Sequence, residues 1–129
     1  GLESNFAENG EYLRSPNMKS GSLNQNDVLK TINNGLYLSN IHYLNWSDNS
    51  GGRITGLTGY ACFLVQDGEI VAPIETMRFD DSFYNFFGDN LIAVEDVVSI
   101  NPEVETYGGR SLGATTCPGV LVDDFSLTL

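Results

Sequence analysis

The residue types that most often carry chemistry are sparse in this sequence. It contains one histidine, His42, and two cysteines, Cys62 and Cys117. These three could in type bind zinc, but structural zinc ligands usually come in pairs about two to four residues apart, and these do not. No serine lies in a recognisable nucleophile turn that His42 could activate. We therefore expect His42 to be a structural residue and both cysteines to be reduced thiols. No catalytic and no metal-binding residue is assigned.

Two further motifs resemble binding loops without completing them. The run from Asp48 to Ser50 begins like a calcium loop, but the sixth and twelfth positions hold Arg53 and Gly59 in place of the required Gly and Glu. A polar turn is the better interpretation. The glycine pairs at 51–52 and 108–109 do not belong to a G-x-x-x-x-G-K phosphate loop.

Four residues remain as candidates for an interface or for the wall of a substrate chamber: His42, Trp46, Arg53 and Arg78. Trp46 belongs to a group of aromatic residues around the first predicted loop, where core or interface packing is expected. Arg78 lies between Met77 and Phe79, so we expect it to pair with a carboxylate. Such a pair could be structural or could mark an interface, and the sequence does not separate the two.

The composition limits the class of protein. The chain has 129 residues, with 17 acidic and 6 basic side chains and a net charge of −11. Nucleic-acid binding is disfavoured because no basic stripe could displace phosphate counterions. No apolar run approaches the ~18 residues of a membrane span. A solvated acidic surface is expected, with a docking face for a basic partner or peptide as the alternative. We predict a cytoplasmic protein.

The hydrophobic pattern predicts an α+β fold, a mainly antiparallel β-sheet with one or two short helices packed on it. Residues 1–23 are polar and are expected to form a flexible arm or linker, and residues 24–129 the β-rich domain. Asn24 suits an N-cap and Gly35 a C′ position, so a helix is predicted between them. Asp67-Gly68 predicts a two-residue hairpin. The other expected elements are strands at 36–44, 54–65, 69–74 and 97–100, a helix from Asp80 or Asp81 to Phe87, a helical turn at 91–94, a turn at Gly108-Gly109, and a last hairpin around Pro118-Gly119.

The ordered series GLYLSNIHYLNWSD, GRITGLTGYACFLVQDGEIVAPIETMRFDDSFYNFFG and the closing segment 111–129 resembles the C-terminal region of the TldD/PmbA (TldE) family, once called modulators of DNA gyrase. The resemblance implies a cytoplasmic zinc metallopeptidase assembled from two related subunits, which cleaves peptides or unfolded proteins. In that family the zinc histidines lie in an HExxxH motif upstream of this region, and a cysteine ligand is placed near Asn40–His42. This sequence has no HExxxH and shows Ile41 and His42 where that cysteine is expected, while Cys62 falls on the next strand. It therefore resembles the metal-free partner subunit or a divergent branch of it.

Three functional hypotheses follow. The first is the C-terminal domain of a TldD/PmbA-like subunit that shapes the subunit interface and the substrate chamber and is not catalytic by itself. Its expected partners are a related subunit, in a homo- or heterodimer, and a peptide substrate, with no nucleic acid and no membrane. No cofactor is expected in this fragment, although zinc is possible in the parent complex. The second is an autonomous acidic β-rich protein-binding module, and the third is a small hydrolase that uses His42.

Overall fold

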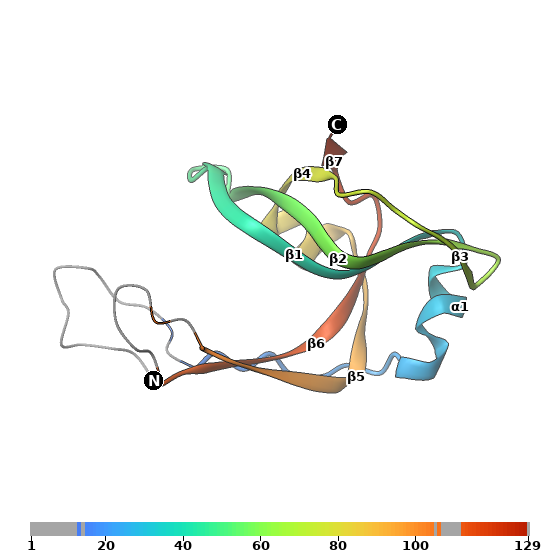
Figure 1. Cartoon of the computed structure of the whole chain (residues 1–129). Helices are drawn as coiled ribbons and strands as arrows, with labels where there is room; N and C mark the ends of the chain where they lie inside the picture. Colours follow the sequence, from blue (N-terminus) through green and yellow to red (C-terminus); the bar gives the residue numbers. More distant parts are fainter. Residues whose placement is uncertain (1–12, 14, 105, 107–111, 129) are drawn as a thin grey trace, which may run out of the picture.

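The computed structural model describes Leu13, residues 15–104, Thr106 and residues 112–128. Two antiparallel sheets form most of the fold (Figure 1). The larger, five-stranded sheet has the order β1-β2-β4-β7, and β3 also pairs with β2; the smaller sheet is the β5–β6 ribbon. The strands of the larger sheet are β1 (Gly35–Asp48), β2 (Arg53–Gln66), β3 (Glu69–Pro73), β4 (Arg78–Ser82) and β7 (Leu127–Thr128). The ribbon consists of β5 (Leu91–Pro102) and β6 (Ala114–Val122). The predicted fold class, mainly antiparallel sheet with short helices, is confirmed.

The β2–β3 hairpin forms where the sequence predicts it. Asp67 and Gly68 both have positive φ, 51° and 78°, as a two-residue turn of the primed type requires. The β1–β2 connection is shorter than the predicted loop, because β1 continues to Asp48. The Asp48 carboxylate accepts a hydrogen bond from the Ser50 N–H at 2.9 Å, which closes a polar turn.

The β1–β2 ladder contains three register shifts, and in two of them, which we call the two bulges, the extra residue is a tyrosine. His42 pairs with Leu57 and Asn45 with Thr55, so β1 holds one more residue than β2 there. Leu38 pairs with Cys62 and Asn40 with Gly59, so β2 holds the extra residue there. Within these two intervals Tyr43 and Tyr60 have φ of 53° and 63°. A bulge increases the local twist and re-aims the neighbouring side chains.

The helical elements are shorter than predicted. Asn24 is the expected N-cap, and its side chain accepts a hydrogen bond from the Asn26 N–H at 2.9 Å. It starts the 3-10 turn η2 (Gln25–Asp27), which leads into α1 (Val28–Ile32). The predicted C′ position at Gly35 is wrong, because the helix ends at Asn33, with φ 57° and ψ −71°, and Gly35 begins β1.

Three predictions in the C-terminal half are wrong. Asp80 and Asp81 do not cap a helix but lie in β4, and the helical turns follow them, with the π-helix η3 at Asn85–Asp89. The segment predicted as a helical turn at 91–94 is the start of β5. Pro118 does not form a turn but pairs with Val98 inside the continuous strand β6. A two-stranded ribbon tolerates proline because each strand has an edge where no N–H is needed. The predicted Gly108-Gly109 turn and residues 1–12 of the predicted arm lie outside the described residues.

The core lies where β2 and β4 meet η3 and the C-terminal segment. Ile54, Phe79 and Phe86 are buried together, and the partly buried side chains packed on them are Phe83, Val122, Phe125 and Leu127. The rings of Phe79 and Phe125 have centroids 5.1 Å apart. Since Val122 ends β6, this core joins the ribbon to the larger sheet.

The segment before η2 runs along the ribbon. Met18 donates its N–H to the Thr116 carbonyl at 2.8 Å, and Leu23 donates its N–H to the Val94 carbonyl at 2.9 Å. The Asp96 carboxylate accepts hydrogen bonds from the Asn24 side chain and the Gln25 N–H, which fixes the start of η2 on β5. In the described part of the chain, no helix has the length and apolar character needed to cross a membrane.

Candidate functional site

His42 projects from β1 over a glycine of the neighbouring strand. A Cβ atom built on Gly59 would lie 2.5 Å from both Cε1 and Nδ1 of the His42 ring, so only a glycine leaves room for the imidazole. The Nδ1 atom is buried and has no hydrogen-bond partner. A buried polar atom without a partner is costly and uncommon in native structures. The ring position is therefore set by the bulged backbone around it rather than by a hydrogen bond of Nδ1.

Two strongly exposed tyrosines contact this imidazole. The Tyr43 ring is tilted against it at 5.3 Å between centroids, and the Tyr60 ring is stacked on it at 5.8 Å. Tyr43 is 82% exposed and Tyr60 83% exposed. We call His42, Tyr43 and Tyr60 the His42 cluster. It presents aromatic faces to solvent from the two bulges of the β1–β2 ladder.

Trp46 belongs to a second aromatic group further along β1. Its ring lies 5.5 Å from that of Phe83, and Phe83 stacks on Phe87 at 5.9 Å. Trp46 and Phe87 are about half exposed, whereas Phe83 also contacts the buried Phe86. This Trp46 cluster, defined as Trp46, Phe83 and Phe87, is an exposed extension of the core.

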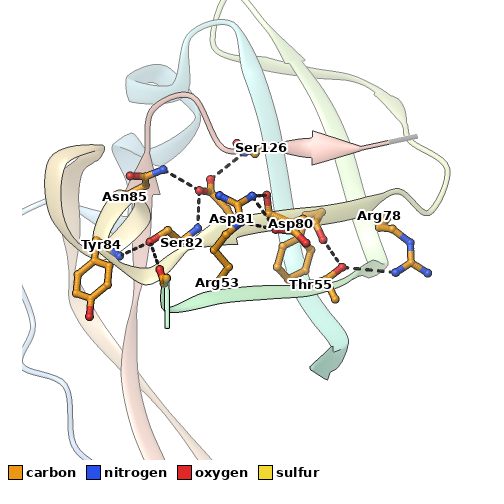
Figure 2. Close-up of polar contacts among 11 residues, drawn as sticks. Arg53, Thr55, Arg78, Asp80, Asp81, Ser82, Tyr84, Asn85 and Ser126 are labelled. Carbon is orange, nitrogen blue, oxygen red and sulfur yellow. Dashed lines mark hydrogen bonds and ion pairs between the residues drawn. The ribbon is translucent and has the colours of Figure 1, made fainter. Parts of the chain in front are cut away.

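Arg53 forms the shortest ion pair among the described residues (Figure 2). Its Nη2 lies 2.7 Å from Oδ1 of Asp80, its Nε donates to the same oxygen at 2.9 Å, and Nη2 also donates to the Asp80 carbonyl at 3.0 Å. The Ser47 side chain also hydrogen-bonds to the Asp80 carboxylate. This hydrogen bond and the guanidinium of Arg53 lower the pKa of Asp80 below its ordinary value. The contacts tie the first residue of β2 to β4, and Ser47 brings in the end of β1.

Arg78 differs from the expectation that a carboxylate would hold it. Its side chain is exposed, and its guanidinium Nη1 donates to Oγ1 of Thr55 at 3.5 Å (Figure 2). No ion pair joins it to a carboxylate within the part of the chain that the structure covers. The neighbouring carboxylate, Asp80, is held by Arg53 instead.

Asp81 is a buried carboxylate that organises the turn after β4 (Figure 2). It is 1% exposed, and it accepts hydrogen bonds from the backbone N–H of Ser82 at 2.7 Å, the Asn85 side chain at 3.0 Å and the backbone N–H of Ser126 at 3.0 Å. Burial raises the pKa of Asp81, but these hydrogen bonds outweigh burial, so the pKa lies below its ordinary value. Asp81 therefore stabilises the fold as an ionised group.

The sheet register keeps the four candidate residues apart. His42 pairs with Leu57, which pairs with Arg78, so these three lie in one row across β1, β2 and β4. Trp46 pairs with Ile54, which pairs with Asp81 in a second row. Residues that pair in adjacent antiparallel strands point to the same face, and the Tyr43 bulge between these rows changes the phase of β1. His42 and Arg78 therefore share one face of the sheet, and Trp46 lies at the other face with the core.

The described residues do not fit a zinc site. Cys62 is buried and its thiol contacts the Gly59 carbonyl oxygen at 3.1 Å, while Cys117 lies on the other sheet, next to Asn101. No group of three His, Cys, Asp or Glu side chains in the described part of the chain is close enough to hold a metal ion. No step through a metal is derived from these residues.

A family model described as the PmbA/TldA metallopeptidase C-terminal domain matches residues 8–129. No curated protein matches the chain. The match covers both sheets, both aromatic clusters and the Arg53–Asp80 pair.

Proposed function

Because the chain belongs to the PmbA/TldD metallopeptidase family, as the C-terminal domain over residues 8–129, we propose that it shapes the subunit interface and the substrate chamber of such a peptidase. The groups that break the peptide bond, and the zinc, belong to other polypeptide. The expected partner is a related subunit in the cytoplasm, and the expected substrate is a peptide or an unfolded protein.

The observation that carries this proposal is the exposed aromatic surface on the β1–β2 hairpin. Tyr43, Leu44, Trp46 and Tyr60 are each more than half exposed, although the core of the domain is small. Exposed apolar surfaces of this kind mark contacts with other proteins or peptides. The stretch from Thr31 to Ser47 has no Asp, Glu, Lys or Arg and is the longest such run in this acidic chain. Aromatic residues are enriched and charged ones depleted at the centre of interfaces.

The four candidate residues take different parts in this proposal. Trp46 lies on the surface that would meet a subunit, because its ring continues outward from the core through Phe83. His42 and Arg78 share the other face, which would line the chamber. Arg53 keeps β2 and β4 in register through Asp80 and so supports both surfaces.

The test combines the chain with a PmbA/TldD-family subunit that carries an HExxxH motif. Sedimentation measures whether a complex forms, and a separate assay measures hydrolysis of an unfolded peptide. We expect the chain alone to be inactive, the mixture to form a complex, and Trp46→Ala to weaken it. Ile92→Ala is the matched control, because Ile92 is equally exposed but lies on β5. A chain that hydrolyses peptides by itself, or that binds proteins but never such a subunit, would refute the proposal. The second result would favour an autonomous binding module.

A further inference from the structure

Tyr43 and Tyr60 hold backbone conformations that tyrosine seldom adopts. Each is the extra residue of a bulge, with φ of 53° and 63°. A bulge residue with left-handed backbone is usually glycine, because a side chain there is strained. Residues that keep such strain cluster at functional sites, where the surrounding structure holds them.

Core packing does not explain why tyrosine stands at these positions. Both rings are more than four-fifths exposed, so neither gains the stabilisation of a buried aromatic side chain. Both rings contact one imidazole, that of His42, from adjacent strands. The two bulges therefore place two aromatic faces side by side in solvent around a fixed imidazole.

The charge distribution indicates what these faces bind. The chain carries a net charge of −11, yet the run from Thr31 to Ser47 and the run from Ile54 to Gln66 are free of Asp, Glu, Lys and Arg. The His42 cluster lies on these two runs, which bring no charged side chain to it, and the register places Arg78 of β4 in the same row beyond Leu57. The field of the whole protein attracts cations and repels anions. Tyrosine faces bind the guanidinium of arginine and the ammonium of lysine by cation–π interaction.

We propose that the His42 cluster is a subsite for a cationic side chain, arginine or lysine, of an extended peptide. This inference rests on the proposed function and adds the substrate class to it. Tyr43 and Tyr60 supply the ring faces. His42 is a positioning residue, since its ring contacts both tyrosines and fills the space above Gly59.

The test titrates capped Gly-Ser peptides with a single central Arg, Lys, Ala or Glu into the 129-residue chain at low salt. The imidazole signals of His42, the only histidine in the sequence, report binding by NMR. We expect the Arg and Lys peptides to bind about fivefold or more tightly than the Ala peptide, in line with two exposed cation–π contacts. The Glu peptide should bind more weakly than the Ala peptide.

Glycine substitutions separate binding from folding. Tyr43→Gly and Tyr60→Gly relieve the backbone strain, so the midpoint of thermal unfolding should stay equal or rise while the preference for Arg and Lys is lost. Tyr60→Phe should keep the preference, because the ring face remains. Asn33→Gly and Asp67→Gly are the matched controls, since both residues also have positive φ but lie away from the cluster. They should keep the preference for Arg and Lys.

Equal binding of the Arg and Glu peptides, or an unchanged preference in both tyrosine-to-glycine variants, would overturn the inference. So would His42 signals that shift with protein concentration alone, because a second copy of the chain would then occupy the cluster. If the chain joins a peptidase subunit but shows no preference for Arg and Lys, only this inference fails. If the preference is present but no subunit is bound, the proposed function fails instead.

Discussion

Gly59 on β2 faces the imidazole of His42 on β1 so closely that a Cβ atom at position 59 would lie 2.5 Å from two ring atoms. The contact links the two bulges, because Tyr60 follows Gly59 and Tyr43 follows His42 in the chain. The arrangement of the His42 cluster therefore depends on the absence of a side chain at position 59.

Gly59→Ala tests this relationship. The added methyl group must displace the His42 ring, and overpacking of this kind costs about 1–3 kcal/mol of unfolding free energy. Urea unfolding measures this loss, and Gly88→Ala is the control, because nothing lies within 4 Å of a Cβ atom at position 88. In the double variant His42→Ala/Gly59→Ala much of the cost should disappear. If Gly59→Ala costs the same unfolding free energy in the wild type and in His42→Ala, the two residues do not interact.

Asp80 and Asp81 are neighbours with different environments, and conversion of each to Asn should separate them. Asp81→Asn should cost about 3 kcal/mol, because the amide cannot accept all the hydrogen bonds that converge on the buried carboxylate. Asp80→Asn should cost less, because Asp80 is partly exposed and its ion pair with Arg53 is screened by solvent. Urea unfolding at neutral pH compares the two variants. A larger loss for Asp80→Asn would contradict the account of this network.

Acid should destabilise the domain through the same two carboxyl groups. The pKa of each is lower in the folded protein than its ordinary value of 3.8, so the folded state binds fewer protons than the unfolded state. Their contribution is therefore complete above the ordinary value and is lost as the pH falls below it. Unfolding free energy measured from neutral pH downward should fall less steeply in Asp81→Asn than in the wild type. The exposed Asp89→Asn serves as the control and should keep the wild-type slope.

Phe79 should be the most sensitive position of the core. It is fully buried on β4 and contacts the Phe125 ring, so Phe79→Ala removes a whole ring from the centre of the domain. The expected loss is about 3–5 kcal/mol. Phe87→Ala, which removes a ring that is 47% exposed, should cost much less. Similar losses at both positions, measured by urea unfolding, would mean that the core is placed wrongly.

Local signals predicted the elements that local interactions decide. Asp67-Gly68 forms its hairpin because two residues that tolerate positive φ stand between apolar runs. Asn24 caps the first helical turn through its own side chain. Apolar residues on both faces of the run 54–65 indicate a central strand, and β2 pairs with β1, β3 and β4.

Long-range contacts decided what the sequence alone did not predict. Asp80-Asp81 before an aromatic run has the pattern of a helix N-cap, yet Asp81 stays in a strand, and one of its three hydrogen bonds comes from Ser126, 45 residues away. Pro118-Gly119 has the pattern of a turn, but pairing with β5 keeps it extended. Arg53, and not Arg78, holds Asp80, because the register of β2 on β4 brings Arg53 within reach. The left-handed tyrosines had no local signal, since tyrosine disfavours that conformation.

Zinc analysis of the purified 129-residue chain tests most directly whether this domain supplies binding surfaces and leaves the metal to other polypeptide. The chain is incubated with zinc, dialysed, and its bound metal is measured for the wild type and for His42→Ala. The account predicts that neither protein retains stoichiometric zinc. One zinc per wild-type chain, lost in His42→Ala, would contradict it.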